Sequence, residues 1–112
     1  MSILEQYMDC MVRGDNVGLA DLFNTYGVLH DTSVMRLRQE TIHLEGKMAI
    51  EMMFHHRFGF NGGPFKIRSV QYRGSRMVSY CIFYNGLVVP VVAILDGLDD
   101  EGKIKRLNIY PM

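Results

Sequence analysis

The sequence predicts an α+β fold in which three helices come first and an antiparallel sheet follows. In the first half of the chain, apolar residues recur with the 3.6-residue period of a helix, and after residue 64 the period changes to two. Asn85-Gly86 lies between two runs rich in β-branched and aromatic residues, which strongly favours a tight hairpin. Helices followed by hairpin-linked strands indicate a meander.

The first two helices are predicted from apolar spacing and from the residues that end or begin them. Residues 3–13 carry apolar side chains at the i, i+3, i+4, i+7 positions of one helix face, namely Leu4, Tyr7, Met8 and Met11. Gly14 is suited to end this helix, and Asp15 or Asn16 can cap the next one. The apolar positions of that second helix are Leu19, Leu22 and Phe23.

A short strand is predicted next, over residues 28–32, because Tyr26-Gly27 interrupts the helical pattern. The polar residues 33–41 indicate an irregular excursion or a hairpin arm leading into residues 41–44. Gly46 precedes a third helix over residues 47–58, which is apolar nearly all round and so needs cover on most sides. Three methionines cluster on it and favour a pocket lining: Met48, Met52 and Met53.

The second half of the chain predicts four strands, at residues 65–72, 77–84, 87–95 and 103–110. The run at 87–95 is apolar at nearly every position, whereas an antiparallel strand usually exposes one face to water. Helices can cover one of its faces, and a partner subunit can cover the other. We therefore expect a homodimer through the outer face of the sheet, and the alternative is burial of both faces within one chain.

Composition limits the kinds of partner. The 112 residues suit one domain, over residues 1–112, and 12 basic residues balance 12 acidic ones. Zero net charge gives no electrostatic reason to expect nucleic acid or membrane partners, and no apolar run reaches the roughly 18–20 residues of a membrane span. Cys10 and Cys81 lie in no paired motif and read as reduced thiols, which predicts a cytoplasmic protein.

Four segments in this order resemble the nuclear transport factor 2-like superfold. They are YMDCMVRGD at 7–15, VLHDT at 28–32, LEGKMAIEMMF at 44–54 and DDEGKIKRLNIY at 99–110. The resemblance covers essentially the whole chain and implies three N-terminal helices packed on a strongly curved antiparallel sheet that forms a cone with an apolar pocket. The enzymes of this superfold include ketosteroid isomerases, scytalone dehydratases and SnoaL-type polyketide cyclases, and the resemblance implies that small-molecule chemistry is possible here.

The resemblance to the isomerase branch implies roles for two residues. Tyr7 matches the helix-1 tyrosine that donates to a substrate carbonyl, and Asp31 matches the strand aspartate that moves the proton. That branch uses a protonated aspartic acid on a late strand as a second donor. The matching position here is apolar, Ile94 or Leu95, and Phe54 stands where the branch often has a tyrosine. In SnoaL-like cyclases a single pocket acid is the main acid–base group.

Each candidate residue also has a structural interpretation. An apolar pocket should raise the pKa of Asp31 and make it a better base, but the same carboxylate could cap backbone N–H groups at the strand end. Tyr7 could donate to an enolate oxygen or could be a helix-face phenol whose hydroxyl reaches the rim. The expected pocket lining is Met8, Met11, Met52, Phe54 and Ile94. The four histidines lack the i, i+4 spacing of a helical zinc pair, so no metal site is predicted.

The leading functional hypothesis is a protein that binds a small apolar carbonyl compound and isomerises, dehydrates or cyclises it by proton transfer. This chemistry needs no organic cofactor and no metal. The alternative is a binding module of the same fold without catalysis, which the missing late-strand acid favours. A third hypothesis is a dimerisation or scaffold subunit whose own side chains fill the pocket.

Overall fold

The computed structural model describes residues 1–37, 39–60, 63–84 and 86–112. Within them the chain forms three α-helices, α1 (Ile3–Arg13), α2 (Asn16–Ala20) and α3 (Lys47–Phe60), and a short 3₁₀ helix, η1 (Ser33–Leu37). Six strands make one sheet in the order β2-β1-β6-β5-β4-β3. Their bounds are β1 (Phe23–Asp31), β2 (Ile42–Glu45), β3 (Lys66–Tyr72), β4 (Met77–Tyr84), β5 (Leu87–Leu95) and β6 (Ile104–Pro111).

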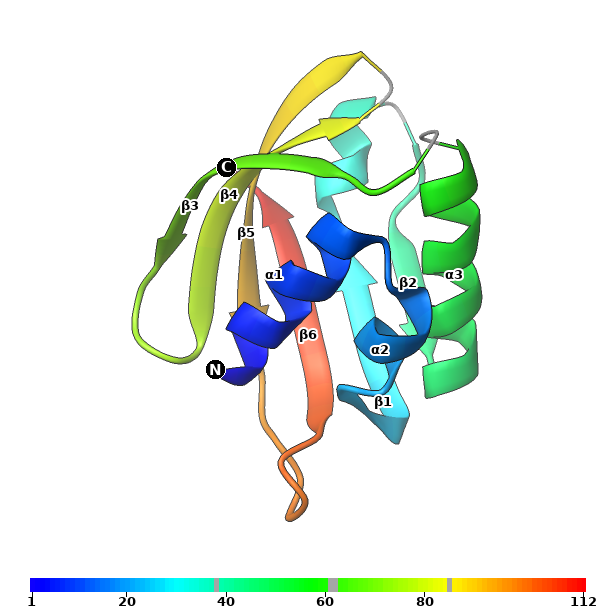
Figure 1. Ribbon diagram of the computed structural model, residues 1–112, viewed down its shortest axis with the longest axis vertical. Coiled ribbons are helices and arrows are strands. Elements are labelled where there is room, and N and C mark those ends of the chain that lie inside the picture. Colours follow the sequence, from blue (N-terminus) through cyan, green and yellow to red (C-terminus); the bar gives the residue numbers. More distant parts are fainter. Residues whose placement is uncertain (38, 61–62, 85) are drawn as a thin grey trace.

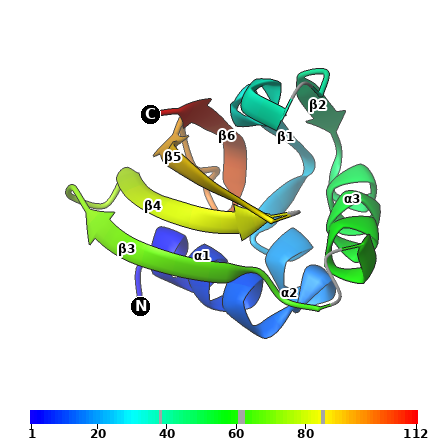
Figure 2. The same cartoon turned by 90° about the horizontal axis from the view of Figure 1, so that it is seen from above.

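The predicted α+β architecture is confirmed. The sheet curves around α1, while α2 and α3 pack together beside the β1–β2 end (Figures 1 and 2). The sheet does not close, because β2 and β3 are left as its two edges. The bounds of β4 and β5 agree with the predicted strands. Asn85, half of the predicted hairpin turn, lies outside the described residues, and Gly86 has the positive φ (77°) that such a turn requires.

The prediction of a purely antiparallel sheet was wrong at one strand pair. β1 and β6 run parallel, whereas the other neighbouring strands in the described part of the chain run antiparallel. Hairpins fix opposite directions for strands that follow one another along the chain. β1 and β6 belong to two separate groups of hairpins with α3 between them, so no tight turn dictates their relative direction.

The boundary between the second helix and the first strand also differs from the prediction. Leu22 and Phe23 were assigned to the helix, but α2 ends at Ala20 and Phe23 begins β1. The reason is pairing with β6, since the Ile104 N–H donates to the Leu22 carbonyl at 2.8 Å. At Gly27 the two strands come so close that a Cβ would lie 2.8 Å from the Ile104 carbonyl oxygen. Tertiary pairing therefore overrides the helical spacing.

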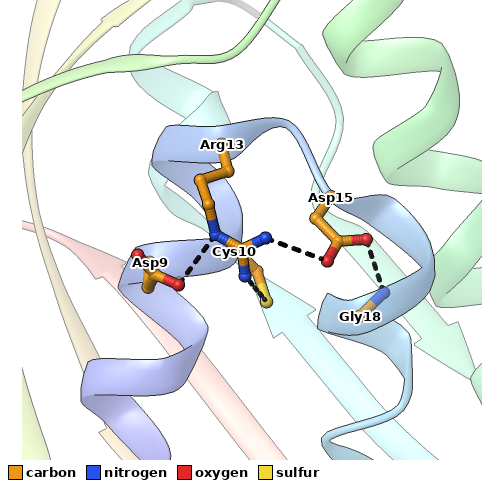
Figure 3. Close-up of polar contacts among 5 residues, drawn as sticks. All are labelled: Asp9, Cys10, Arg13, Asp15 and Gly18. Carbon is orange, nitrogen blue, oxygen red and sulfur yellow. Dashed lines mark hydrogen bonds and ion pairs between the residues drawn. The ribbon is translucent and has the colours of Figure 1, made fainter.

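The corner between α1 and α2 is fixed by a small polar cluster (Figure 3). Gly14 ends α1 in the left-handed conformation, with φ 72°. Asp15 then caps α2 by accepting a hydrogen bond from the Gly18 N–H at 2.8 Å. Arg13 bridges the two helices, with nitrogen–oxygen distances of 2.8 Å to Asp9 and 3.4 Å to Asp15. This corner turns the chain so that both helices face the core.

The core fills the space between α1 and the concave face of the sheet. Alternate residues of β5 point into it and are buried: Val89, Val91, Ala93 and Leu95. The intervening residues lie on the convex face, where Val88 is 56% exposed.

None of the helices in the described part of the chain combines the length and apolar character needed to cross a bilayer.

We expect Asp15→Ala to lower the free energy of unfolding by about 1 kcal/mol, because the Gly18 N–H loses its cap. Asp9→Ala is the matched control, since it removes a carboxylate whose side-chain partner among the described residues is Arg13, in an exposed i, i+4 pair. Urea unfolding of both variants measures the difference. Equal losses would contradict the capping role of Asp15.

Candidate functional site

A cavity of about 60 Å³ lies between α1, α3, η1 and the concave face of the sheet. A single water needs roughly 10–15 Å³ and a benzene-sized cavity measures about 150 Å³, so this space accepts a molecule of a few atoms. Most of the lining is apolar: Met11, Val34, Ile42, Met53, Phe54, Phe65, Ile82, Val89, Val91 and Ile109. The polar side chains in it are those of Tyr7, Asp31, Ser33, Arg57 and Tyr80.

Tyr7 reaches the cavity from α1 and is completely buried. Its ring packs edge-on against Phe54, with centroids 6.3 Å apart and planes at 83°. Among the described residues its hydroxyl makes no hydrogen bond of good geometry, although the Tyr80 side chain is close enough for a weaker hydrogen-bonding interaction that contributes to the raised pKa of Tyr7. A buried hydroxyl left in this state costs on the order of 1–3 kcal/mol. Tyr7 therefore lines the cavity with a poorly satisfied hydroxyl, and this hydroxyl does not reach the rim.

Asp31 ends β1, in register with Ile42 of β2 and Ile109 of β6. Its Oδ1 accepts two hydrogen bonds from Ser33, one from the backbone N–H at 2.8 Å and one from the hydroxyl at 2.5 Å. The Asp31 carboxylate therefore caps the turn after β1 and also lines the cavity. The hydrogen bonds found among the described residues leave Oδ2 available to a ligand.

Burial raises the pKa of Asp31 above its ordinary value. The two hydrogen bonds from Ser33 and the positive charge of Arg57 oppose this shift, but the loss of hydration is the larger effect. Arg57 is itself held in place, since it donates to Gln39 at 3.3 Å. An ionised carboxylate in this environment is a stronger base than one in water.

Tyr80 on β4 is a site residue that the sequence reasoning missed. It is 3% exposed and lines the same cavity as Tyr7. Burial, and after it the negative charge of Asp31, raises the pKa of Tyr80, and burial likewise raises the pKa of Tyr7. Both phenols are thus protonated donors at neutral pH. The signal was present in the alternation of β4, which places Tyr80 on the inward face together with Val78 and Ile82.

The structure places two of the five expected lining residues, Met11 and Phe54, in the cavity. Met8 is buried in the core but does not line this space. Met52 is 50% exposed, because α3 presents only one side to the sheet, and its neighbour Met53 lines the cavity instead. Ile94 lies on the convex face of β5 in register with Asn108, so the period of two points it away from the cavity.

The histidines of β1 and β2 lie on the convex side of the sheet. His30 and His43 face each other across the two strands, with Nδ1 atoms 2.9 Å apart, and His43 also contacts Glu45 at 3.2 Å. Within the described residues no group of three or more His, Cys, Asp or Glu side chains is arranged to hold a metal ion.

Neither a protein-family model nor a curated protein matches this sequence. Solved structures do match it along nearly its whole length. A nuclear transport factor 2-like protein of unknown function from Burkholderia xenovorans is 22% identical, with a TM-score of 0.69 over 97% of this chain and 79% of that one. The fold is that of nuclear transport factor 2-like proteins.

Two further structures carry informative descriptions. A protein with a ketosteroid isomerase-like fold from Catenulispora acidiphila, in complex with trimethylamine, is 16% identical, with a TM-score of 0.68 over 96% of this chain and 83% of that one. A putative SnoaL-like polyketide cyclase from Shewanella denitrificans is 14% identical, with a TM-score of 0.67 over 96% and 86%. At these identities the nuclear transport factor 2-like likeness establishes the fold and leaves the activity to the site.

We expect Asp31→Asn to raise the melting temperature by several degrees at pH 7. Burial raises the folded-state pKa of Asp31, so the folded protein holds this proton more tightly than the unfolded chain. The free energy of unfolding therefore falls as the pH rises from the pKa of Asp31 in the unfolded chain, about 3.9, through its higher pKa in the folded protein. The asparagine variant does not titrate and so does not lose this stability. Calorimetry at several pH values should show the difference shrinking as the pH falls and vanishing below about pH 4.

Asp100→Asn is the control for this experiment. Because Asp100 is exposed, this substitution should change the melting temperature little at any of these pH values. A lower melting temperature for Asp31→Asn at pH 7 would show that the carboxylate is mainly a structural cap for Ser33.

Proposed function

We propose that this protein, as one nuclear transport factor 2-like domain over residues 1–112, binds a small carbonyl compound in its cavity and catalyses proton transfer on it. Asp31 is the base and then the acid, and Tyr7 donates a hydrogen bond to the carbonyl oxygen. The observation that carries the proposal is the combination of the poorly satisfied Tyr7 hydroxyl and a carboxylate of raised pKa in one apolar cavity. A ligand that makes hydrogen bonds to both groups would stabilise them, because the hydroxyl has a poorly satisfied donor and the carboxylate is poorly hydrated.

The chemistry follows from these two groups. The Asp31 carboxylate takes a proton from the carbon next to the carbonyl, and the electron pair of that C–H bond becomes the C=C bond of an enolate. The carbonyl π electrons move onto oxygen, where the Tyr7 hydroxyl stabilises the charge. Asp31, now a carboxylic acid, returns the proton to the same or a neighbouring carbon. Isomerisation follows from return to a different carbon, while dehydration or an aldol-type cyclisation starts from the same enolate.

The size of the cavity favours a compact substrate or one that inserts only its reactive end, because 60 Å³ holds a few atoms. The trimethylamine in the Catenulispora acidiphila structure is a ligand of comparable size in the same fold. The mainly apolar lining supports a substrate with one polar atom rather than a sugar or a nucleotide.

The alternative is a binding module without catalysis. It is supported by the apolar side chain that replaces the late-strand acid: Leu95 is 4% exposed and belongs to the core, and Ile94 faces the other way. The two possibilities differ in what Asp31 does once a ligand is bound. Binding needs only its charge or its hydrogen bonds, whereas catalysis needs it to exchange a proton.

Acetone in deuterated water tests the proposal. We expect the protein to accelerate exchange of the methyl protons above the rate given by the same concentration of acetate, and Asp31→Asn to reduce this acceleration at least about 100-fold. Proton NMR measures exchange, and the rise in melting temperature with acetone concentration measures binding. Asp100→Asn should retain the full rate. Binding of acetone without proton exchange would identify a binding module. The absence of both binding and exchange would favour a scaffold subunit.

We also propose that two copies pair through the convex face of the sheet, where Val88, Pro90 and Val92 of β5 form an apolar stripe and Val88 is 56% exposed. Light scattering at micromolar concentration should give twice the chain mass, and Val88→Arg should return a monomer because it places charge at an apolar contact. A monomeric mass for the unmodified protein would exclude the dimer.

A further inference from the structure

Two histidines on the convex face of the sheet have no part in the chemistry proposed for the cavity. His30 of β1 and His43 of β2 are directly opposite each other in the antiparallel register of the two strands. Their Nδ1 atoms are 2.9 Å apart and their ring centroids are 5.1 Å apart. Because side chains alternate along a strand, Asp31 lies on the opposite face, so the histidine pair is separate from the cavity.

A carboxylate determines where the hydrogens of this pair lie. His43 Nε2 is 3.2 Å from Oε1 of Glu45, and an ionised carboxylate can only accept, so neutral His43 carries its hydrogen on Nε2. Nδ1 of His43 then has a lone pair, and Nδ1 of His30 donates a hydrogen to it. A histidine that donates through its other nitrogen to a carboxylate is the usual arrangement of a metal ligand.

We propose that His30 and His43 bind a divalent ion of the late first transition row through their Nδ1 atoms, and that Glu45 orients His43 for this role. A metal lies about 2.0–2.1 Å from an imidazole nitrogen, so two nitrogens that subtend roughly 90–110° at the metal are about 2.9–3.4 Å apart. The observed separation of 2.9 Å lies in this range. After a small rotation of the rings the ion replaces the shared hydrogen, which moves to Nε2 of His30.

The donor atoms define the class of ion. Imidazole suits Cu²⁺, Ni²⁺ and Zn²⁺, whereas Mg²⁺ and Ca²⁺ prefer oxygen ligands. The general order of affinity places Cu²⁺ first among the divalent ions of this row. The described residues contain no group of three or more His, Cys, Asp or Glu side chains that could hold a metal, so water completes the coordination of an ion bound by the two imidazoles. Such an ion is exchangeable, unlike a structural zinc with four protein ligands.

The surroundings of the pair leave it accessible to a cation. The side chain of His43 is 42% exposed and that of Glu45 is 76% exposed. The neighbouring strand β6 brings a basic side chain close, but the Arg106 guanidinium donates to Asn108, the residue in register with His30, at 2.9 Å. The charge in contact with the pair is therefore the negative charge of Glu45, which favours a bound cation.

Pulsed electron paramagnetic resonance of the protein with one equivalent of Cu²⁺ tests the site, because it detects each coordinated imidazole. We expect two imidazoles in the unmodified protein and one in His30→Gln or His43→Gln. Competition with glycine should show an affinity for Cu²⁺ at least about 10-fold lower in each variant. The matched control replaces both His55 and His56 by glutamine. These neighbouring histidines are exposed on α3, with ring centroids 5.8 Å apart, and their loss should change neither result.

A further substitution tests the orienting role of Glu45 and alters neither ligand. Glu45→Gln should keep the two-imidazole spectrum and lower the affinity for Cu²⁺ about 10–100-fold. Unchanged affinity in this variant would overturn the role of Glu45. The site itself would be overturned by fewer than two imidazoles in the spectrum of the unmodified protein, which does not depend on the folding of any variant. Unchanged affinity in His30→Gln and His43→Gln, or lost affinity in the α3 control, would overturn it as well.

Discussion

The packing of α1 across the concave face of the sheet is the contact on which the site depends. It buries Tyr7 completely and brings its hydroxyl to the cavity that Asp31 lines from β1. Leu4, Met8 and Met11 lie on the same helix face and supply the apolar contacts that hold the helix there. A helix on a flat sheet would exclude all space beneath it. The strands instead curve around α1 (Figure 2), and a small cavity that polar side chains help to line lies between this helix and the sheet.

Burial then determines the chemistry that the polar groups can perform. At Asp31 two influences compete, because the donors of Ser33 favour the ionised form and the loss of hydration disfavours it. Loss of hydration prevails, so the carboxylate is basic and yet held in one orientation through Oδ1. The same loss of hydration raises the pKa of both phenols and keeps them as donors. One physical cause thus makes the carboxylate a stronger base and keeps both phenols protonated.

The spacing of apolar and capping residues predicted those parts of the fold that depend on interactions between residues close in sequence. The alternation of β4 and β5 and the caps of α1 and α2 depend on neighbours in sequence, and there the expected elements agree with the structure. The parallel pairing of β1 with β6 depends on residues about 80 positions apart, which no short pattern encodes. In the site, the sequence indicated Tyr7 and Asp31 through a family resemblance. It could not distinguish Met52 from Met53 on a helix apolar all round, and Tyr80 required knowledge of which face of β4 is concave.

The charges in the cavity favour the proposed proton transfer over the capture of an anion. Ionised Asp31 already places a negative charge in an apolar space, and Arg57, held by Gln39, offsets it only in part. An anionic ligand would add a second charge beside the first, which is costly where hydration is poor. Transfer of a proton from ligand to Asp31 moves the negative charge onto the ligand oxygen without adding to the total. In the proposed reaction the charge leaves a carboxylate with two donors from Ser33 and arrives near the poorly satisfied Tyr7 hydroxyl, so that the proposed step never places two negative charges in the cavity.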